Sequence, residues 1–225
     1  MRRGLGELKE GWAALQNAML TLLGLMLAFT FGMTVSKFES RREIIVEEAN
    51  DIGTAILRCD LYPDSSRSEL RNYFKQYVET RIAYYHAGGN EQKIRATMDE
   101  GAKYTAMIWS KVIALSHDPD KQVRSMQMIP AVNAIIDIAG AREAERNAQV
   151  PRLILLTLLL LTITGSFLIG YDQPRTDRSN IFVVGFAVMI TLTIYLILEL
   201  DRPRAGLINL HASEKMIEDL LKMLP

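Results

Sequence analysis

The apolar residues of this 225-residue chain gather in three long windows and are not spread evenly. The windows are Trp12–Val35, Leu153–Gly170 and Ile181–Leu200, and the last two hold no charged residue except Glu199. A helix needs roughly 20 apolar residues to cross the hydrocarbon core of a bilayer. The pattern therefore predicts three transmembrane helices.

The windows divide the chain into six segments, and no stretch shows the alternation typical of a strand. The expected segments are a polar N-terminal lead at 1–11, transmembrane helix 1 at 12–36, an extramembrane helical domain at 37–150, transmembrane helices 2 and 3 at 151–171 and 180–200, and an amphipathic C-terminal tail at 201–225. The predicted fold class is an all-α membrane protein with a helical domain between its first and second spans.

Start and stop signals divide the middle domain into helices. Ser66 to Glu69 (SRSE) is a capping-box pattern that opens one helix, and Gly88-Gly89-Asn90 ends it. Glu91 is expected to begin the next helix. Asp118-Pro119 separates a third helix, expected from about 120 to 150, which contains Pro130 and continues directly into the second span.

A short amphipathic helix is predicted near the C-terminus, opening at Ser213. Its apolar positions lie on one side and its charged positions on the other. Two placements fit this pattern: the helix lies on a membrane surface, or it packs on a partner helix.

The first span has no stop signal where the apolar window ends. Steps of three and four from Asn17 follow one row that stays small or apolar almost throughout, broken beyond the membrane by Arg42. The row is Asn17, Thr21, Gly24, Ala28, Phe31, Val35, Phe38, Arg42, Ile45, Ala49, Ile52, Ile56 and Cys59. Because the row keeps its phase, it predicts one helix of roughly 45 residues, on the order of 70 Å long, that extends well beyond the membrane.

Small residues at Gly24, Ala28 and Gly32 mark a helix-packing face within this span. Small residues four apart let helix backbones approach closely in lipid. The partner is either the chain's own other two spans or copies of the same chain. Two observations favour self-association. The soluble extension keeps its apolar row, and three spans alone make a bundle too thin to enclose a pathway.

A second row on the same helix is polar. Its members are Thr30, Thr34, Lys37, Arg41, Glu48, Asp51 and Arg58. One interpretation is a solvated helix face with ion pairs. The other is a pore lining formed by Thr30, Thr34, Lys37, Arg41, Glu48 and Asp51 around the axis of an oligomer, since rings of hydroxyls and charges discriminate between ions.

The remaining chemistry argues against an enzyme. The formal net charge is zero, which does not suggest a nucleic-acid partner. Cys59 is the single cysteine, and His86, His117 and His211 have no metal-ligand spacing. The sequence has no glycine-rich phosphate loop and no nucleophile elbow. We expect no catalytic residue, no metal and no cofactor.

An acidic motif closes the third window. Glu199 and Asp201 stand where the span ends, and Pro203 then redirects the chain. Ionisable residues within a span are costly and are commonly functional. Glu199 is close enough to the end to act as an interfacial anchor, whereas Asp201 is free to pair with Arg202, Arg204 or a basic residue near Lys37.

Several of these stretches resemble the bestrophin-like domain family of bacterial and plant membrane proteins. The resemblance rests on Phe29-Thr30-Phe31, Arg41-Arg42, the run from Glu48 to Thr54 (EANDIGT) and Tyr62-Pro63, with a second signature at Leu200–Gly206 (LDRPRAG). The family name implies similarity to bestrophins, which are pentameric anion channels whose membrane pore continues into a cytosolic helical vestibule.

The resemblance and the polar row together favour a homo-oligomeric ion channel or pore of a bacterial inner membrane, with the first helix lining the axis. The implied partners are the lipid bilayer, copies of the chain (possibly in a pentamer) and inorganic ions. Basic residues flank both membrane sides, and their bias places the middle domain in the cytosol. The alternative is a membrane-anchored helical scaffold or sensor without a pore.

Overall fold

The computed structural model describes residues 2–172, 177–202, 208 and 210–224. Every regular element in these residues is helical, which confirms the all-α prediction. The chain divides into two compact units. Unit 1 comprises Met1–Phe38 and Gln149–Arg202, and unit 2 comprises Glu39–Ala148 and Pro203–Pro225. Each unit is described by itself.

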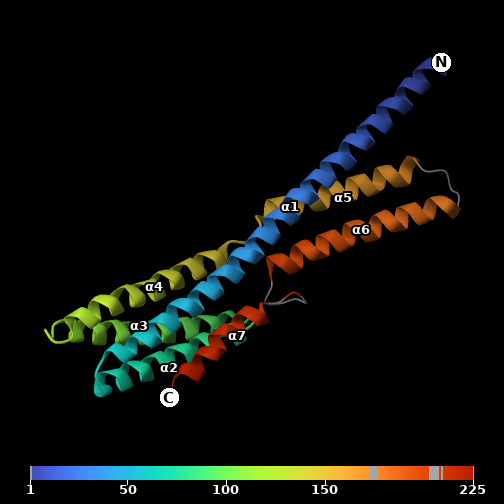
Figure 1. Cartoon of the computed structure of the whole chain (residues 1–225). Coiled ribbons are helices and arrows are strands. Elements are labelled where there is room, and N and C mark those ends of the chain that lie inside the picture. The colour runs from blue at the N-terminus through green and yellow to red at the C-terminus, as the bar shows by residue number, and fades with distance from the viewer. Residues whose placement is uncertain (1, 173–176, 203–207, 209, 225) are drawn as a thin grey trace. The chain divides into compact units, whose positions relative to one another are not determined.

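The first helix, α1, is continuous from Arg2 to Arg58 and is 57 residues long (Figure 1). It confirms that the helix continues past the apolar window into the charged segment. It is longer than the predicted 45 residues because it begins at Arg2, so the polar lead is part of the helix. No proline occurs between these bounds, and interior proline is the residue that most strongly breaks a helix.

Unit 1 contains the N-terminal part of α1 together with α5 (Arg152–Asp172) and α6 (Asp177–Asp201). Its core is formed by Leu23, Leu158 and Ile190, one residue from each helix. Three stretches of the described chain are long and apolar enough to cross a membrane, and they include parts of α1, α5 and α6. The three predicted spans are therefore present as helices.

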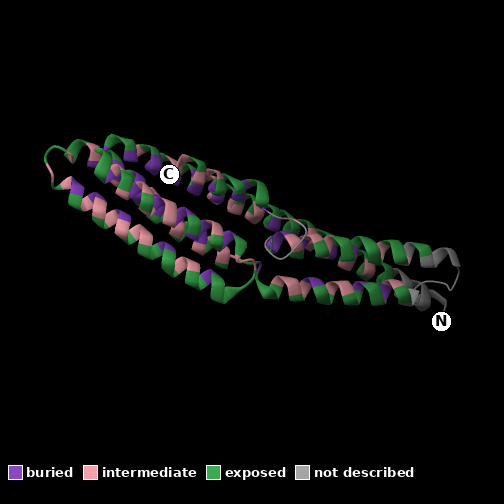
Figure 2. Cartoon of the chain, turned by 90° about the horizontal axis from the view of Figure 1, so that it is seen from below, coloured by how far each residue is buried: buried purple, intermediate pink, exposed green. Residues whose placement is uncertain are grey.

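Unit 2 contains the C-terminal part of α1, together with α2 (Asp64–His86), α3 (Glu91–Ser116), α4 (Gln122–Asn147) and α7 (His211–Asp219). Two short 3-10 turns, η1 (Cys59–Leu61) and η2 (Leu220–Met223), follow α1 and α7. Helix α3 packs between α2 and α4. Figure 2 shows the buried residues in purple along helix faces and the exposed ones in green. Buried side chains from all five helices make the core: Ile52, Ile56, Phe74, Val78, Ile108, Val112, Val132, Ile135 and Ile217. Burying each such side chain fully contributes about 1.5–3 kcal/mol.

The boundaries of α2 and α3 partly match the predicted signals. Helix α2 begins at Asp64 after Pro63, two residues before the predicted capping box, and Ser66 lies buried in its first turn. The predicted break after α2 is confirmed, since Gly88 adopts φ 59°, a conformation that favours glycine. The start of α3 at Glu91 is also confirmed, because the Asn90 side chain accepts a hydrogen bond from Lys93 N–H at 3.0 Å.

The predicted direct continuation of the third middle-domain helix into the second span is wrong. Helix α4 ends at Asn147 and α5 begins at Arg152, with four non-helical residues between them. Proline disfavours a helical conformation of the residue before it, which explains a break at Val150-Pro151. Pro130, by contrast, lies inside α4, which continues on both sides of it.

The C-terminal helix packs on another helix of its own chain, which is one of the two predicted placements. Helix α7 and η2 lie against α2 and bury Ile217 and Leu220 (Figure 1). The backbone carbonyl of Met223 accepts a hydrogen bond from Arg71 Nη1 at 2.8 Å. Gly53 of α1 allows a close approach here, since a Cβ at that position would lie 3.3 Å from Leu220 Cδ2.

Candidate functional site

The membrane part of the predicted polar row faces the interior of unit 1. Thr30 and Thr34 are both buried, with Thr34 showing 0% exposure. Each hydroxyl donates a hydrogen bond within its own helix, from Thr30 to the Met26 carbonyl at 2.7 Å and from Thr34 to the Phe31 carbonyl at 2.8 Å. Both hydroxyls therefore form their hydrogen bonds within the chain itself.

The extramembrane part of the row divides between partly exposed and buried side chains. Lys37, Arg41 and Asp51 are half-buried. Arg41 donates to the Ala148 carbonyl at 3.2 Å and lies 3.9 Å from a carboxylate oxygen of Glu145. Burial and the negative charges of neighbouring carboxylates, Glu47 first, raise the pKa of Asp51.

Glu48 is the centre of a buried charge cluster in unit 2. Its side chain is 0% exposed, and Arg81 of α2 donates to it through Nε (2.6 Å to Oε1) and Nη2 (3.3 Å to Oε2). The Tyr85 hydroxyl donates to Oε2 at 2.6 Å. Nη1 of Arg142, from α4, also donates to Oε1. Three helices are thus joined through one carboxylate.

The electrostatics of the cluster keep Glu48 ionised. Burial alone would raise its pKa, but the charges of Arg81 and Arg142 and the hydrogen bonds to the carboxylate outweigh burial, so its pKa is lowered. Burial and the negative charge of Glu48 raise the pKa of Tyr85, which keeps its hydroxyl protonated and donating. The Glu48 charge likewise holds Arg81 in its charged form.

Aromatic rings complete the surroundings of the two guanidinium groups. The Arg81 guanidinium carbon lies 4.3 Å from the centroid of the Tyr84 ring and 5.1 Å from that of Tyr85. The Arg142 carbon lies 5.0 Å from the Tyr84 centroid. Cation–π contacts of this kind are worth more when they are removed from water.

Sequence reasoning did not predict this cluster, although one signal was available. Arg81 occupies the helix stripe that carries Phe74, Tyr77 and Val78, and a charged residue on an apolar stripe calls for a buried partner. No comparable pattern points to Arg142, because its nearness to Glu48 depends on the packing of α4.

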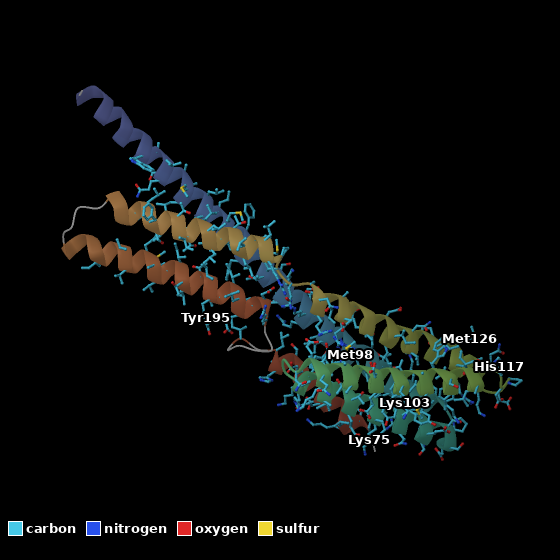
Figure 3. All side chains as sticks on the ribbon, turned by 180° about the vertical axis from the view of Figure 1, so that it is seen from behind. Lys75, Met98, Lys103, His117, Met126 and Tyr195 are labelled. Atoms are coloured by element: carbon cyan, nitrogen blue, oxygen red, sulfur yellow. The ribbon has the colours of Figure 1, made fainter. Side chains whose placement is uncertain are left out.

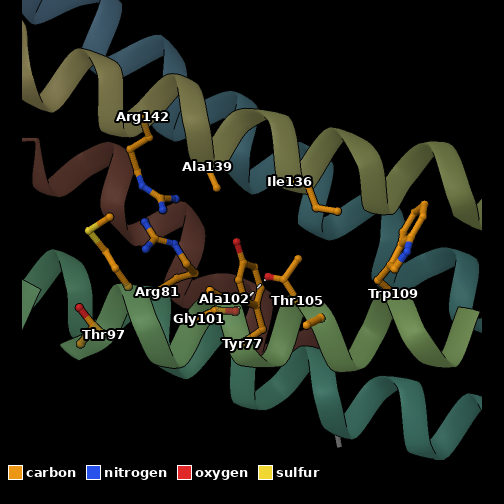
Figure 4. Close-up of a pocket in the computed structure, with 12 residues that line it drawn as sticks. Tyr77, Arg81, Thr97, Gly101, Ala102, Thr105, Trp109, Ile136, Ala139 and Arg142 are labelled. Atoms are coloured by element: carbon orange, nitrogen blue, oxygen red, sulfur yellow. Dashed lines mark hydrogen bonds between the residues drawn. The ribbon is translucent and has the colours of Figure 1, made fainter. Parts of the chain in front are cut away.

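A pocket of about 420 Å³ lies beside the cluster, within unit 2. Figure 4 shows Arg81 and Arg142 at one end of it and Trp109 of α3 at the other. Ala102 of α3 and Ile136 of α4 line the space between these ends.

The predicted helix-packing face of α1 is uncovered in the single chain. Gly24, Ala28 and Gly32 are all exposed. A Cβ placed at Gly24 or Gly32 would meet nothing within 4 Å in the described part of the chain beyond the helix's own backbone. The chain's own two other spans therefore do not occupy this face.

In the acidic motif, Asp201 has a structural role within unit 1. Asp201 is buried, and its Oδ1 accepts a hydrogen bond from the Val150 backbone N–H at 3.0 Å. This bond satisfies a buried donor in the non-helical segment before α5. Glu199 is half-buried, and Pro203 lies outside the described residues.

The cysteine and histidines are dispersed. Cys59 is buried, and desolvation raises the pKa of its thiol to about 12. His86 lies 3.1 Å from Glu218 and His211 lies 3.0 Å from Glu214. Figure 3 shows His117 at the end of the helical part of unit 2, and it is exposed. In the described residues, no three histidine, cysteine or acidic side chains are grouped as a metal site.

Comparisons with known proteins connect this architecture to one family. The sequence model of the Bestrophin-like domain matches residues 14–213. A comparison with curated proteins gave no match.

Solved structures have the same fold at low sequence identity. A crystal structure of a bacterial bestrophin homologue from Klebsiella pneumoniae has a TM-score of 0.75 and 14% identity, covering 93% of this chain and 86% of that one. A crystal structure of such a homologue carrying one mutation has a TM-score of 0.76 and 12% identity, covering 93% and 87%. A likeness at this identity establishes the fold.

Proposed function

Because the chain belongs to the bestrophin-like domain family, we propose that it forms a homo-oligomeric ion channel in a bacterial inner membrane. In this proposal α1 of each copy is the helix nearest the symmetry axis. The membrane segments are 12–36, 151–171 and 180–200, and the extramembrane domain is cytosolic. The partners are lipid, further copies of the chain and inorganic ions.

The observation that carries the proposal is the uncovered face of α1. The other spans of the same chain pack on the side of α1 that carries Leu23 and Thr30, and leave the small residues at Gly24 and Gly32 open. A helix with small residues on an open face is suited to close packing with another helix in lipid. A second copy of α1 is the partner that this face fits.

The same observation selects which residues are proposed to face the axis. Thr30, Thr34 and Glu48 are covered by their own chain, so we leave them out of the lining. Phe31 is 38% and Val35 is 36% exposed, and both lie at one edge of this uncovered face, whereas Gly32 lies at its other edge, about 60–100° further around the helix. We propose that the edge with Phe31 and Val35 turns to the axis, while the edge with Gly32 contacts the next copy. Lys37, Arg41 and Asp51, which are half-buried, lie about 120–160° around the helix from Val35, so we leave them out of the narrowest part of the pathway as well.

Cysteine substitution tests this assignment directly. Val35→Cys places a thiol on the proposed lining, and Phe29→Cys is the matched control, because it is exposed and lies about 120° around the helix from Val35. The native Cys59 is buried with a raised pKa, so it contributes little background reaction. A charged, membrane-impermeant thiol reagent should block ion flux through Val35→Cys channels in liposomes and leave Phe29→Cys channels unchanged.

Two outcomes would overturn the proposal. The first is a protein that remains monomeric in mild detergent and passes no current in liposomes. The second is an oligomer that passes no current in any variant, which would instead indicate the scaffold without a pore, its axis sealed by apolar side chains such as Phe31.

A further inference from the structure

The charges of the buried cluster in unit 2 do not balance. Arg81 and Arg142 carry two positive charges, and within the described chain Glu48 is the one carboxylate at ion-pair distance from either guanidinium. Arg81 is 1% exposed, and its two hydrogen bonds to Glu48 use Nε and Nη2, not Nη1. A buried charge without a counter-charge is costly, so the cluster is suited to a further anion.

The space for such an anion lies next to the arginines. Both Arg81 and Arg142 line the 420 Å³ pocket, whose size is within the range of small-molecule sites. Figure 4 shows the two guanidinium groups together at the same end. A carboxylate there would accept a hydrogen bond from Nη1 of Arg81 and add a second negative charge beside the two arginines, and arginine binds carboxylates through charge-assisted hydrogen bonds.

Apart from Tyr77, Thr97 and Thr105, the rest of the pocket is apolar. Met98, Ala102, Ala106 and Trp109 of α3 and Ile136 of α4 line it. The Thr97 and Thr105 hydroxyls also line the pocket, but each donates to a carbonyl of its own helix. The distance from Arg142 to Ile136 along α4 is about 9 Å, which leaves room for a short hydrocarbon body beyond the charged end.

We propose that this pocket binds a small organic monocarboxylate. The carboxylate lies against Arg81 and Arg142, and the apolar body extends along α3 toward Trp109. A simple inorganic anion lacks the apolar body, and a neutral or cationic amphiphile lacks the charge that the arginines require. The site lies wholly in unit 2 and does not depend on the proposed channel.

Fluorescence of the full-length protein in lipid nanodiscs tests the site and the orientation together. The chain has two tryptophans, so Trp12→Phe leaves Trp109 as the reporter. The probe is 8-bromooctanoate, whose terminal bromine quenches tryptophan on contact. We expect saturable quenching that octanoate reverses by competition. Acetate and octylamine should compete at least about tenfold more weakly, and 8-bromo-1-octanol should not give saturable quenching.

Two variants separate binding from folding. Arg142→Gln should weaken binding of 8-bromooctanoate by about tenfold or more, the loss of one charge-assisted hydrogen bond. Ala106→Leu fills the pocket without touching the charge cluster and should also abolish saturable quenching. Ala114→Leu, at an exposed site on the same helix, is the control and should bind as the parent does.

The proposal is overturned if quenching is absent, if 8-bromo-1-octanol quenches as the carboxylate does, or if Ala106→Leu binds normally. Absence of quenching includes the case in which a second copy of the chain covers the pocket. If Arg142→Gln does not fold, the comparison of Ala106→Leu with Ala114→Leu shows whether 8-bromooctanoate binds in this pocket.

Discussion

Replacing Glu48 by glutamine removes the one negative charge of the buried cluster while keeping the size of the side chain. The carboxylate accepts four hydrogen bonds, two from Arg81 and one each from Arg142 and Tyr85. The glutamine carbonyl oxygen replaces one of the two acceptor oxygens, and its NH2 group faces donors at the other. At least one charged donor therefore loses its acceptor, and both arginines lose their counter-charge.

The cost follows from where these groups lie. The Arg81 side chain is 1% exposed, whereas the Arg142 side chain is 10% exposed and is better placed to reach water. Removing one partner of a buried ion pair costs about 3–5 kcal/mol. For a chain of this length, 1 kcal/mol lowers Tm by about 2–4 °C, so Glu48→Gln should lower Tm by about 6–20 °C.

The assay is thermal unfolding of the full-length protein in mild detergent, followed by circular dichroism. Glu47→Gln is the control, since the neighbouring Glu47 is exposed and its replacement should change stability by about 0.5 kcal/mol at most. The pH dependence supplies a second test. The Glu48 pKa is lowered in the folded protein, so its contribution is complete above the ordinary value of about 4.3 and is lost as pH falls through the folded value. The Glu48→Gln variant should lack the part of the parent's stability that is lost when Glu48 is protonated at low pH. A Tm within 2 °C of the parent would refute the reasoning.

Three further predictions concern other parts of the chain. Asp201→Ala should leave the Val150 N–H without its acceptor and cost about 1–3 kcal/mol, seen as a lower Tm, while Glu199→Ala, at a half-buried site, should cost less; equal losses would contradict this role of Asp201. Cys59 should resist a thiol reagent at pH 8 in the folded protein and react after denaturation, because it is buried with a pKa of about 12; rapid labelling of folded protein would contradict its placement. Thr34→Val should leave ion flux in liposomes within about twofold of the parent, because the Thr34 hydroxyl donates to its own helix; a changed ion selectivity would return Thr34 to the pore lining.

The sequence predicted the parts of the fold that depend on local pattern. Apolar windows identified the three membrane-type helices, and an unbroken periodicity identified the continuation of α1 past Ser36. The helix break at Gly88 and the cap at Asn90 were also readable, since both use local backbone chemistry. The break before Pro151 was misread, although the proline itself disfavours a helical conformation at Val150.

The candidate site was less predictable because a helix row does not say which neighbour it faces. Thr30, Glu48 and Asp51 belong to one predicted row of α1, and in that row Thr30 and Glu48 are buried within the protein's own chain while Asp51 is half-buried. The pairing of Glu48 with Arg142 joins residues 94 positions apart and depends on tertiary packing. Of the cluster, only Arg81 could be suspected from the sequence, because it lies on an apolar helix stripe.

A density map of the purified protein in lipid nanodiscs tests the central claim most directly, because it shows subunit number and the axis together. The account predicts several copies around one axis, with α1 innermost and Phe31 and Val35 facing an open path. A monomer, or an oligomer in which α5 or α6 surrounds the axis and α1 faces lipid, would contradict it.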